Sequence, residues 1–253
     1  GQSGQDYLGD EFSASSKSKT YISQLYNLVP GEIIKYSYRF VNASSDDIQL
    51  QITENGDLIH STFTDGFGNY DYSYGIETER GFTYDGNIPD NRSALEFTFN
   101  AVEQFSRGYI DYFEIEYIRE LKAVQDQIIF FAGPDVDGVT EYDVTNFSTS
   151  DIKVFNIDKF DEVTEITNGA ITAGEISFRV DENGSEKGKY IVLHPNAYKQ
   201  PVNFVEAPNS NIHGMQDEGE LLIISNKRFS EQAERLRDYK ENRSRDKLPS
   251  ALV

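Results

Sequence analysis

Cysteine is absent from the 253 residues of this chain, and histidine occurs only three times. The lack of cysteine excludes disulfide bonds, thiol catalysis and cysteine-ligated zinc within the chain. The histidines are His60, His194 and His213, and no two of them have the spacing of metal ligands. Because imidazole and thiolate are the ligands that transition metals favour, the sequence predicts no transition-metal site.

Positive charge is also scarce. Lys and Arg number 23 against 43 Asp and Glu, so the formal net charge is −20. Binding of nucleic acid depends on neutralisation of phosphates by Lys and Arg, so this balance argues against nucleic acid as a partner and disfavours an anionic membrane surface. It is compatible with a solvated surface, or with binding of cations or basic partners.

Long hydrophobic runs are missing as well. No stretch of ~18 apolar residues is present, so no membrane-spanning segment is predicted. The first residues, Gly1 to Gly4, lack the charged and apolar regions of a signal peptide. We expect an exported protein whose signal has been removed, although an internal fragment would look the same.

Aromatic residues are abundant, with 16 Tyr and 17 Phe, and they favour strands. Apolar and polar side chains alternate through residues 20–132, which indicates strands with one buried face. Asn55-Gly56 lies between two such runs and is typical of a tight hairpin, because both turn positions need a positive φ. Seven to nine strands without a convincing helix predict a mainly β fold, with a jelly-roll-like β-sandwich over residues 1–132.

A Gly-Pro-Asp break at residues 133–135 marks the predicted start of a second, smaller β domain, residues 133–210. Its strands are expected near residues 153–157, 175–180 and 190–193. The polar sequence of residues 181–184 is typical of a turn.

The last segment, residues 211–253, has a different pattern. Leu221 to Ile224 is an unbroken apolar run, which is typical of a strand buried on both faces in a parallel α/β sheet. A helix pattern follows, with Phe229, Ala233 and Leu236 on one stripe. We therefore predict the first βα unit of a truncated α/β domain.

Tyrosines set among glycines are the candidate ligand-binding residues. Such rings could stack on the faces of sugars, which suggests a carbohydrate-binding surface. Ordinary strand aromatics that alternate with turn glycines give the same pattern. The tyrosines are Tyr70, Tyr72, Tyr74 and Tyr84, and the glycines are Gly66, Gly68, Gly75 and Gly81.

Asp135-Val136-Asp137-Gly138 resembles part of a calcium-binding loop, but the third ligand before the glycine and the later glutamate are missing. A solvated acidic turn fits the same residues, and a calcium ion bound by loop carboxylates is possible; no other cofactor is expected. The serines lack an adjacent histidine base, and no G-x-S-x-G motif is present. No catalytic residue is predicted in this chain.

Two stretches of the chain resemble the sequence patterns of a known family. The first comprises Arg107–Leu121 and Gln127–Phe130 and resembles the pattern Y-L-D-Y-I-x-I-x-Y-x-R-x-L … Q-x-x-F. The second resembles the pattern D-x-x-I-I-T … F-x-x-Q-A-x-x-L and comprises Asn211–Met215, Glu220–Ser225, Phe229, Gln232-Ala233 and Arg235-Leu236. Both patterns are those of the PorU family, the large surface proteins of the type IX secretion system that are built on a gingipain-type cysteine peptidase domain, and the second is the entry into that domain.

Two shorter matches follow the same order along the chain. Gly9-Asp10 resembles the opening W-L-G-D of the family, with Tyr7 in place of Trp. Tyr142 to Asn146 resembles the turn W-D-V-T-D, again with Tyr for Trp. None of these stretches is catalytic in the family, so they specify the family better than an activity.

The resemblance implies the amino-terminal, non-catalytic region of a cell-surface sortase. Such proteins cleave the sorting domain from secreted cargo and attach the cargo to surface lipopolysaccharide. Their nucleophilic cysteine and partner histidine would lie beyond Val253, so this chain is not expected to be an enzyme. The implied partners are other type IX secretion components or cargo, and the following peptidase domain. The implied location is the bacterial cell surface, in association with the outer membrane.

Two other functions remain open. The tyrosines among glycines suggest a carbohydrate-binding module. Gingipain-like cysteine proteases also carry a β-rich region ahead of the peptidase, so the chain could be the propeptide region of such a secreted protease.

Overall fold

The structure is a computed structural model that describes residues 8–68, 75–85, 87–134, 136–183, 187–203, 205–206, 220–242 and 247–252. The chain divides into two compact units, residues 1–198 and residues 199–253. The first unit contains two separate hydrophobic cores, one in each of two β domains. The fold is mainly β, as predicted, and ends in a parallel βαβ segment.

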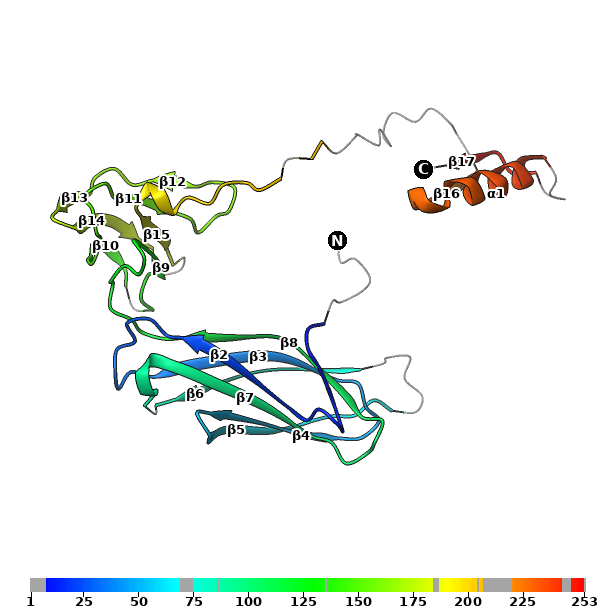
Figure 1. The fold of residues 1–253 in the computed structure, drawn as a ribbon, viewed down its shortest axis with the longest axis horizontal. Helices are drawn as coiled ribbons and strands as arrows, with labels where there is room; N and C mark the ends of the chain where they lie inside the picture. The colour runs from blue at the N-terminus through cyan, green and yellow to red at the C-terminus, as the bar shows by residue number, and fades with distance from the viewer. Residues whose placement is uncertain are drawn as a thin grey trace. The chain divides into compact units, whose positions relative to one another are not determined.

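The first domain is a sandwich of two four-stranded antiparallel sheets (Figure 1). One sheet has the order β1-β8-β3-β6 and the other β2-β7-β4-β5, which is the order of a jelly roll. The strands are β1 (Glu11–Ser13), β2 (Ser18–Gln24), β3 (Ile34–Asn42), β4 (Ile48–Glu54), β5 (Asp57–Thr64), β6 (Ile76–Tyr84), β7 (Arg92–Asn100) and β8 (Arg107–Glu116), with a short 3₁₀ helix η1 (Pro89–Asn91) before β7.

The predicted alternation sets the faces of these strands. In β3, Tyr36, Tyr38 and Phe40 point into the core, whereas the residues between them are partly or fully exposed. The β4–β5 hairpin turns at Asn55-Gly56, whose φ angles are 50° and 94°, as the sequence predicted. The jelly roll is therefore held by inward rows of aromatic and branched side chains from both sheets.

The second domain contains two small sheets with the orders β12-β11-β15-β9 and β10-β14-β13. Its strands are β9 (Gln127–Phe131), β10 (Gly138–Val144), β11 (Lys153–Asn156), β12 (Thr164–Glu165), β13 (Ala170–Thr172), β14 (Glu175–Glu182) and β15 (Lys189–Leu193), followed by the 3₁₀ helix η2 (Pro195–Ala197). The predicted turn at 181–184 differs from the structure, because Asp181 and Glu182 continue β14 opposite Val139 and Gly138.

Strand β9 lies on the first-domain side of the limit predicted at residue 132, yet it pairs with β15. Its inward residues, Ile128 and Phe130, belong to the second core. The Gly-Pro-Asp break that suggested the limit lies between two strands of the second domain. A break in the sequence pattern marks a turn, and a turn within a domain looks the same as one between domains.

The connector between the two β domains, residues 117–124, is hydrogen-bonded on both sides. Towards the first domain, the Val29 N–H donates to the Ile118 carbonyl at 3.0 Å, and the Glu120 N–H donates to the Asn27 carbonyl at 2.9 Å. Towards the second, Thr145 donates to the Leu121 carbonyl and accepts from Ala123. The connector is thus part of the folded structure.

The second unit contains β16 (Leu221–Ile223), the 3₁₀ helix η4 (Lys227–Phe229), α1 (Ser230–Asn242) and β17 (Ser250–Leu252). Strands β16 and β17 are parallel, with Leu221 opposite Ser250, so the predicted βα unit continues into a second strand. Leu222 is 57 % exposed and Phe229 61 % exposed, whereas Ala233 is buried. The strand and the helix stripe are therefore in place, but much of their apolar surface faces solvent.

Candidate functional site

The four predicted ligand-binding tyrosines are not brought together by the described structure. Tyr70, Tyr72 and Tyr74 lie outside the described residues. Tyr84 ends β6 opposite Ile34 and is half-buried. Partial burial, together with the negative charges of Asp57, Glu54 and Asp85, raises its pKa. The carbohydrate-binding surface stays a prediction.

The acidic segment that resembled a calcium loop is described only in part. Asp135 lies outside the described residues, and Gly138 opens β10 with a φ of 78°. Within the described ranges, no group of three or more His, Asp or Glu residues is placed to hold a metal ion. Calcium binding therefore stays a proposal that rests on the sequence alone.

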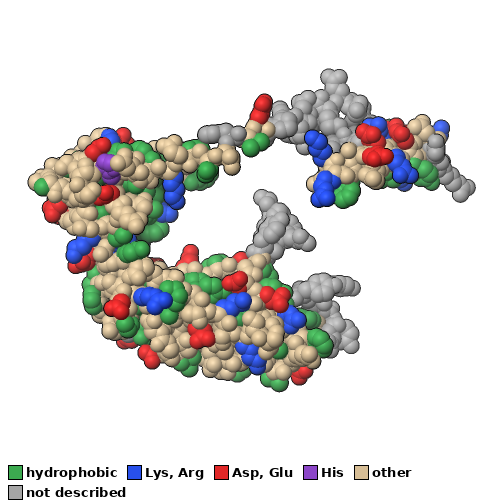
Figure 2. Space-filling view, viewed as in Figure 1, with side chains coloured by type: hydrophobic (Ala, Val, Ile, Leu, Met, Phe, Trp, Pro, Cys, Tyr) green, Lys and Arg blue, Asp and Glu red, His purple; other side chains and the backbone are tan. Residues whose placement is uncertain are grey.

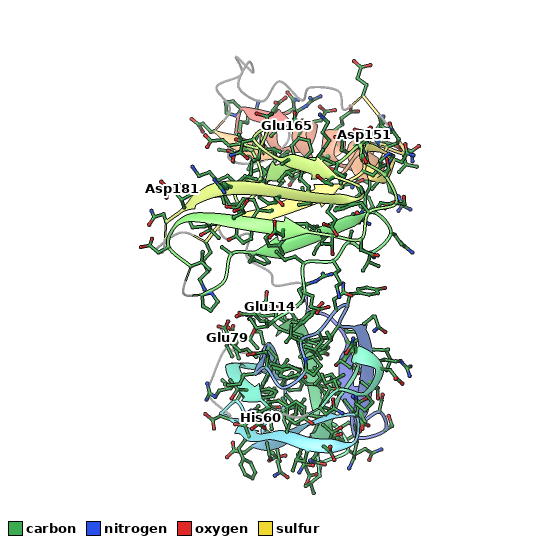
Figure 3. All side chains as sticks on the ribbon, turned by 90° about the vertical axis from the view of Figure 1, so that its left-hand side faces the viewer. His60, Glu79, Glu114, Asp151, Glu165 and Asp181 are labelled. Atoms are coloured by element: carbon green, nitrogen blue, oxygen red, sulfur yellow. The ribbon has the colours of Figure 1, made fainter. Side chains whose placement is uncertain are left out.

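Charged side chains cover the outer face of the sheet that contains β3. Arg39 binds Glu77 at 2.6 Å and Asp111 at 2.5 Å, and its guanidinium lowers the pKa of Glu77. Glu79 and Glu114 come from the strands on either side of β3 and lie on this same face (Figure 3). In Figure 2, acidic and basic side chains are scattered over the surface of the first domain. Charges of both signs that alternate in this way, some exposed and some partly buried, fit a solvated face.

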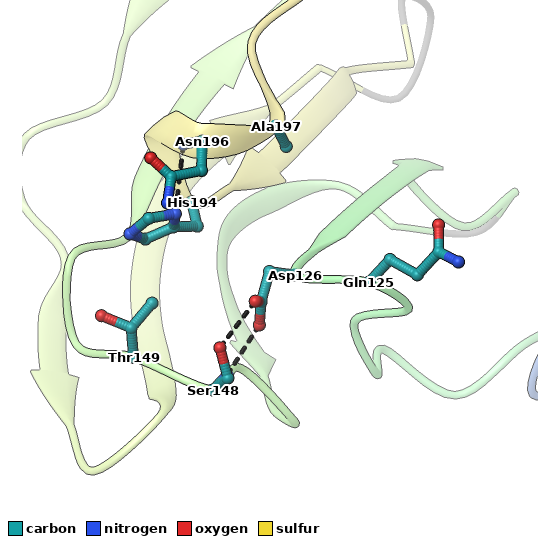
Figure 4. A pocket seen from close by; sticks show the side chains of 7 residues that line it. All are labelled: Gln125, Asp126, Ser148, Thr149, His194, Asn196 and Ala197. Carbon is teal, nitrogen blue, oxygen red and sulfur yellow. Dashed lines mark hydrogen bonds between the residues drawn. The ribbon is translucent and has the colours of Figure 1, made fainter.

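A polar pocket of about 380 Å³ lies among three loops of the second domain (Figure 4). The first loop is a two-residue hairpin turn, Gln125-Asp126, with φ angles of 53° and 56°. The second loop follows β10, and the third follows β15 and opens η2. The residues around the pocket are Gln125, Asp126, Ser148, Thr149, His194, Asn196 and Ala197.

Asp126 holds these three loops together. Its carboxylate accepts from the Ser148 N–H at 2.7 Å and from the Ser148 hydroxyl at 2.6 Å. Its carbonyl accepts from the His194 N–H at 2.9 Å. The hydrogen bonds from Ser148 lower the pKa of Asp126, and the neighbouring His194 acts in the same direction. The pocket floor is thus preorganised around a carboxylate that is ionised at neutral pH.

Asp126, Ser148 and His194 are the residue types of a catalytic triad, but they are connected differently. The Ser148 hydroxyl donates to Asp126, and His194 Nδ1 accepts from the Asn196 N–H at 3.1 Å, which caps η2. The Ser148 hydroxyl proton is therefore directed at a carboxylate and not at a histidine nitrogen of the described residues, whereas a nucleophilic triad needs a histidine base beside the serine. The pocket can hydrogen-bond a small polar or cationic group through the carboxylate, the imidazole Nε2 and the surrounding hydroxyls and amides.

Sequence reasoning missed two buried glutamates, one in each β domain. Each of them joins the two sheets of its domain. Glu54 is 1 % exposed and ends the inward row of β4. Its Oε2 accepts from the Tyr36 hydroxyl at 2.8 Å and from the Ser93 hydroxyl at 2.7 Å, and its Oε1 accepts from the Ala94 N–H at 2.8 Å. Tyr36 belongs to the opposite sheet, so we call this arrangement the Glu54 clasp.

The second domain repeats the device. Glu182 is 4 % exposed and ends the inward row of β14. Its Oε1 accepts from the hydroxyls of Tyr142 at 2.8 Å and Tyr190 at 2.7 Å, and the second of these comes from the other sheet. Its Oε2 accepts from the Gly188 N–H at 3.3 Å. Each core therefore contains one carboxylate whose partners are protein hydroxyls and amides, which satisfies its buried oxygens.

The core tyrosines, by which we mean Tyr36, Tyr38, Tyr142 and Tyr190, all have raised pKa values. Burial is the main cause in each case, because it disfavours the charged phenolate. The carboxylate of Glu54 raises the pKa of Tyr36 further, and the carboxylate of Glu182 does the same for Tyr142 and Tyr190. Burial raises the pKa of Tyr38 to about 12.

His60 lies within β5 and is half-buried (Figure 3). Its ring stacks on Phe82 with centroids 4.4 Å apart, and its Nε2 lies 3.3 Å from the Tyr38 hydroxyl. Burial lowers the pKa of His60, and the positive charge of Arg80 adds to this. The surroundings of His60 are those of a packed neutral imidazole.

No protein-family model matches the sequence, and no curated protein matches it. Among solved structures, the crystal structure of dimeric latent PorU from Porphyromonas gingivalis superimposes on 98 % of the chain with a TM-score of 0.71, at 16 % sequence identity. The chain shares its fold with a region of PorU. It spans 24 % of the PorU chain, about a quarter of its length.

Two carbohydrate-binding modules match a smaller part of the chain. The CBM36-1 domain of a multidomain xylanase from the hindgut metagenome of Trinervitermes trinervoides covers 46 % of this chain and 89 % of its own, at 14 % identity and a TM-score of 0.31. TmCBM61 in complex with beta-1,4-galactotriose covers 44 % of this chain and 69 % of its own, at 13 % identity and a TM-score of 0.27. These low scores carry no functional argument, whereas the PorU match includes both β domains and the βαβ segment.

Proposed function

We propose that this chain is the non-catalytic amino-terminal region of a PorU-like cell-surface sortase. In this proposal, the whole protein cleaves sorting domains from secreted cargo and attaches the cargo to surface lipopolysaccharide. The two β domains serve as a scaffold and as a docking region for secretion partners or cargo. The observation that carries the proposal is the fold shared with PorU over 98 % of the chain.

The second unit supports the same proposal. A parallel strand–helix–strand segment is the start of an α/β sheet, and such a sheet buries both faces of its strands. Leu222, Ile224, Phe229 and Leu236 are all between 45 % and 78 % exposed in this unit. A following peptidase domain would cover these side chains. The part of the chain that the structure describes contains no helix long and apolar enough to cross a membrane, and the proposed location at the cell surface rests on the likeness to PorU.

The docking role can be tested on the whole protein with two substrates. One is a cargo protein that carries its sorting domain, and the other is a short peptide that contains only the cleavage site. Deletion of residues 8–198 should slow cargo processing at least tenfold and leave cleavage of the short peptide within a factor of two. Equal processing of cargo by the two forms would contradict the docking role.

The propeptide alternative makes the opposite prediction for the same reagents. A propeptide inhibits its mature enzyme, so the isolated chain added in trans would suppress cleavage of the short peptide. A sortase docking region added in trans should instead compete only for cargo. The chain alone should turn over neither substrate, because it contains no cysteine to act as the nucleophile.

A further inference from the structure

Strand β9 is an edge of its sheet, and its outward face is apolar. Among the described residues it pairs only with β15. Ile129 is 48 % exposed and Phe131 64 % exposed. Ile129 stands opposite Ile191, and Ile191 stands opposite Phe155, so an apolar row crosses three strands and ends at the open edge. In Figure 2, hydrophobic side chains reach the surface of this domain in several places.

The backbone of β9 presents hydrogen-bonding groups at this edge. The Ala132 N–H donates to the Gly188 carbonyl, and the His194 N–H donates to the Asp126 carbonyl, so the even-numbered residues of β9 face β15. In an antiparallel pair the alternate residues face the other way. Gln127 uses its groups in the hairpin with Val124. The N–H and C=O groups of Ile129 and Phe131 therefore point to the open edge.

Three other sheet edges are protected in the ways that usually prevent pairing with another chain. Strand β12 has only two residues, β5 is irregular where it pairs with β4 near Ile52, and β10 carries Glu141 and Asp143 on its exposed side. Strand β9 has five residues, with neither a proline nor a charged side chain. An unprotected edge of this kind is a ready template for an added strand.

The charge beside the edge indicates what the added strand carries. Lys189 lies opposite Phe131, and its Nζ is 5.0 Å from the centre of the Phe131 ring, so the side chain leans from β15 over Phe131 of the edge strand. No carboxylate pairs with Lys189 among the described residues. A carboxylate on a strand added beside Phe131 would lie within reach of this ammonium group.

We propose that the β9 edge binds an extended segment of a partner protein as an added strand. The segment places an apolar side chain beside Ile129 and an acidic side chain beside Phe131, next to Lys189. Backbone hydrogen bonds to Ile129 and Phe131 give the strand its register, and the apolar row gains a fourth member. This deepens the docking role proposed above, but it needs only the second β domain.

The proposal can be tested with this chain and a fluorescein-labelled peptide of seven residues. The peptide alternates threonine with two valines and one glutamate, so that both valines and the glutamate share one face. We expect saturable binding by fluorescence anisotropy, with NMR shift changes centred on residues 127–131. Lys189→Glu should weaken binding of this peptide at least tenfold. The same variant should prefer a second peptide in which lysine replaces the glutamate. Phe131→Glu should weaken binding of the glutamate peptide, because it removes the apolar side chain and places a second carboxylate beside the glutamate of the peptide.

Two controls isolate the edge. Val139→Lys changes an exposed apolar residue on an edge strand of the other sheet and should leave binding unchanged. A peptide N-methylated at the amides that face β9 keeps its side chains but loses its hydrogen bonds, and it should not bind. Three outcomes would each overturn the proposal. The methylated peptide binds as well as the parent peptide, the parent peptide does not bind, or sedimentation shows that self-association of the chain blocks the edge. None of these outcomes depends on cargo processing, so this test and the deletion test can fail separately.

Discussion

Replacing Glu54 with leucine removes the acceptor of three hydrogen bonds in the interior of the first domain. The Tyr36 and Ser93 hydroxyls are buried and lose their acceptor, and the Ala94 N–H loses its partner. Leucine has a similar volume, so packing changes little, and the substitution acts through hydrogen bonding. The opposite sheet loses its polar attachment to β4.

The size of the effect follows from the number of orphaned groups. Each buried hydroxyl left without a partner costs about 1–3 kcal/mol. Removal of a desolvated carboxylate offsets part of this. We expect Glu54→Leu to lower the free energy of unfolding by about 3 kcal/mol, which is a large share of the ~5–15 kcal/mol that stabilises a domain.

The same reasoning predicts that the effect of Tyr36→Phe on stability changes sign when Glu54 is replaced by leucine. Tyr36→Phe alone should destabilise the first domain by about 1.5–3 kcal/mol, because it removes a hydrogen bond to a carboxylate. In the Glu54→Leu background it should stabilise the domain, because it removes a hydroxyl that has no acceptor. Adding Ser93→Ala should recover more. Such coupling is expected of residues that share one hydrogen-bond network.

Hydrogen–deuterium exchange resolved by peptide is the appropriate assay, because a chain with two β domains need not unfold in a single transition. Urea unfolding followed by tyrosine fluorescence gives a second measure, since the chain has no tryptophan. Peptides from residues 48–54 should exchange faster in Glu54→Leu, and those from residues 127–156 should not. Additive effects of Glu54→Leu and Tyr36→Phe would refute the clasp.

Four further outcomes follow from the cores and turns. Because the pKa values of the core tyrosines are raised in the folded state, the contribution of these residues to stability is complete below pH 10 and is lost as pH rises above it. In a titration followed by tyrosinate absorbance, the core tyrosines should therefore ionise after the other tyrosines and together with unfolding. The lowered pKa of His60 means that its contribution is complete above pH 6.5 and declines as pH falls, and His60→Phe should flatten this acid limb in thermal melts. Gly174→Ala should cost at least about 2 kcal/mol in urea unfolding, because φ is 86° and the new Cβ would lie 2.4 Å from the Phe147 carbonyl oxygen. Gly56→Ala, at φ 94° with open space around it, should cost only about 1 kcal/mol.

The period-two pattern predicted the sandwich well, because burial on one face imposes that pattern on every strand of the core. The run from Ile48 to Ile52 and the Asn55-Gly56 turn together located a hairpin within a residue or two. Sequence order, by contrast, contains no direct information on which strand pairs with which, so the assignment of β9 to the second domain needed the structure.

The two clasps could have been found from the same pattern. Glu54 lies on the same face of its strand as Ile48, Leu50 and Ile52. Glu182 lies on the same face as Ile176 and Phe178. A glutamate at the end of an inward row signals a buried carboxylate that needs hydroxyl partners. The hydroxyl partners themselves could not be predicted. Tyr36 lies in the sheet opposite Glu54, and Tyr190 lies in the sheet opposite Glu182, and the sequence does not state how two sheets are placed against each other.

The polar pocket could not have been predicted for a similar reason. Asp126, Ser148 and His194 belong to three loops that are distant in sequence, and none of the three matches a motif. The turn at Gln125-Asp126 also lacked its usual signal, because glutamine rarely adopts the positive φ that it has there.

The hydrogen-bonded connector between the β domains bears on how the protein can be cut. Proteases need several residues of locally opened backbone, and exposed loop tips usually supply them. Residues 117–124 offer no such stretch until the bonds to Asn27, Val29 and Thr145 are broken. Mild digestion should therefore release the jelly roll and its smaller neighbour as one fragment, and an attempt to produce either alone by trimming at this point would damage both.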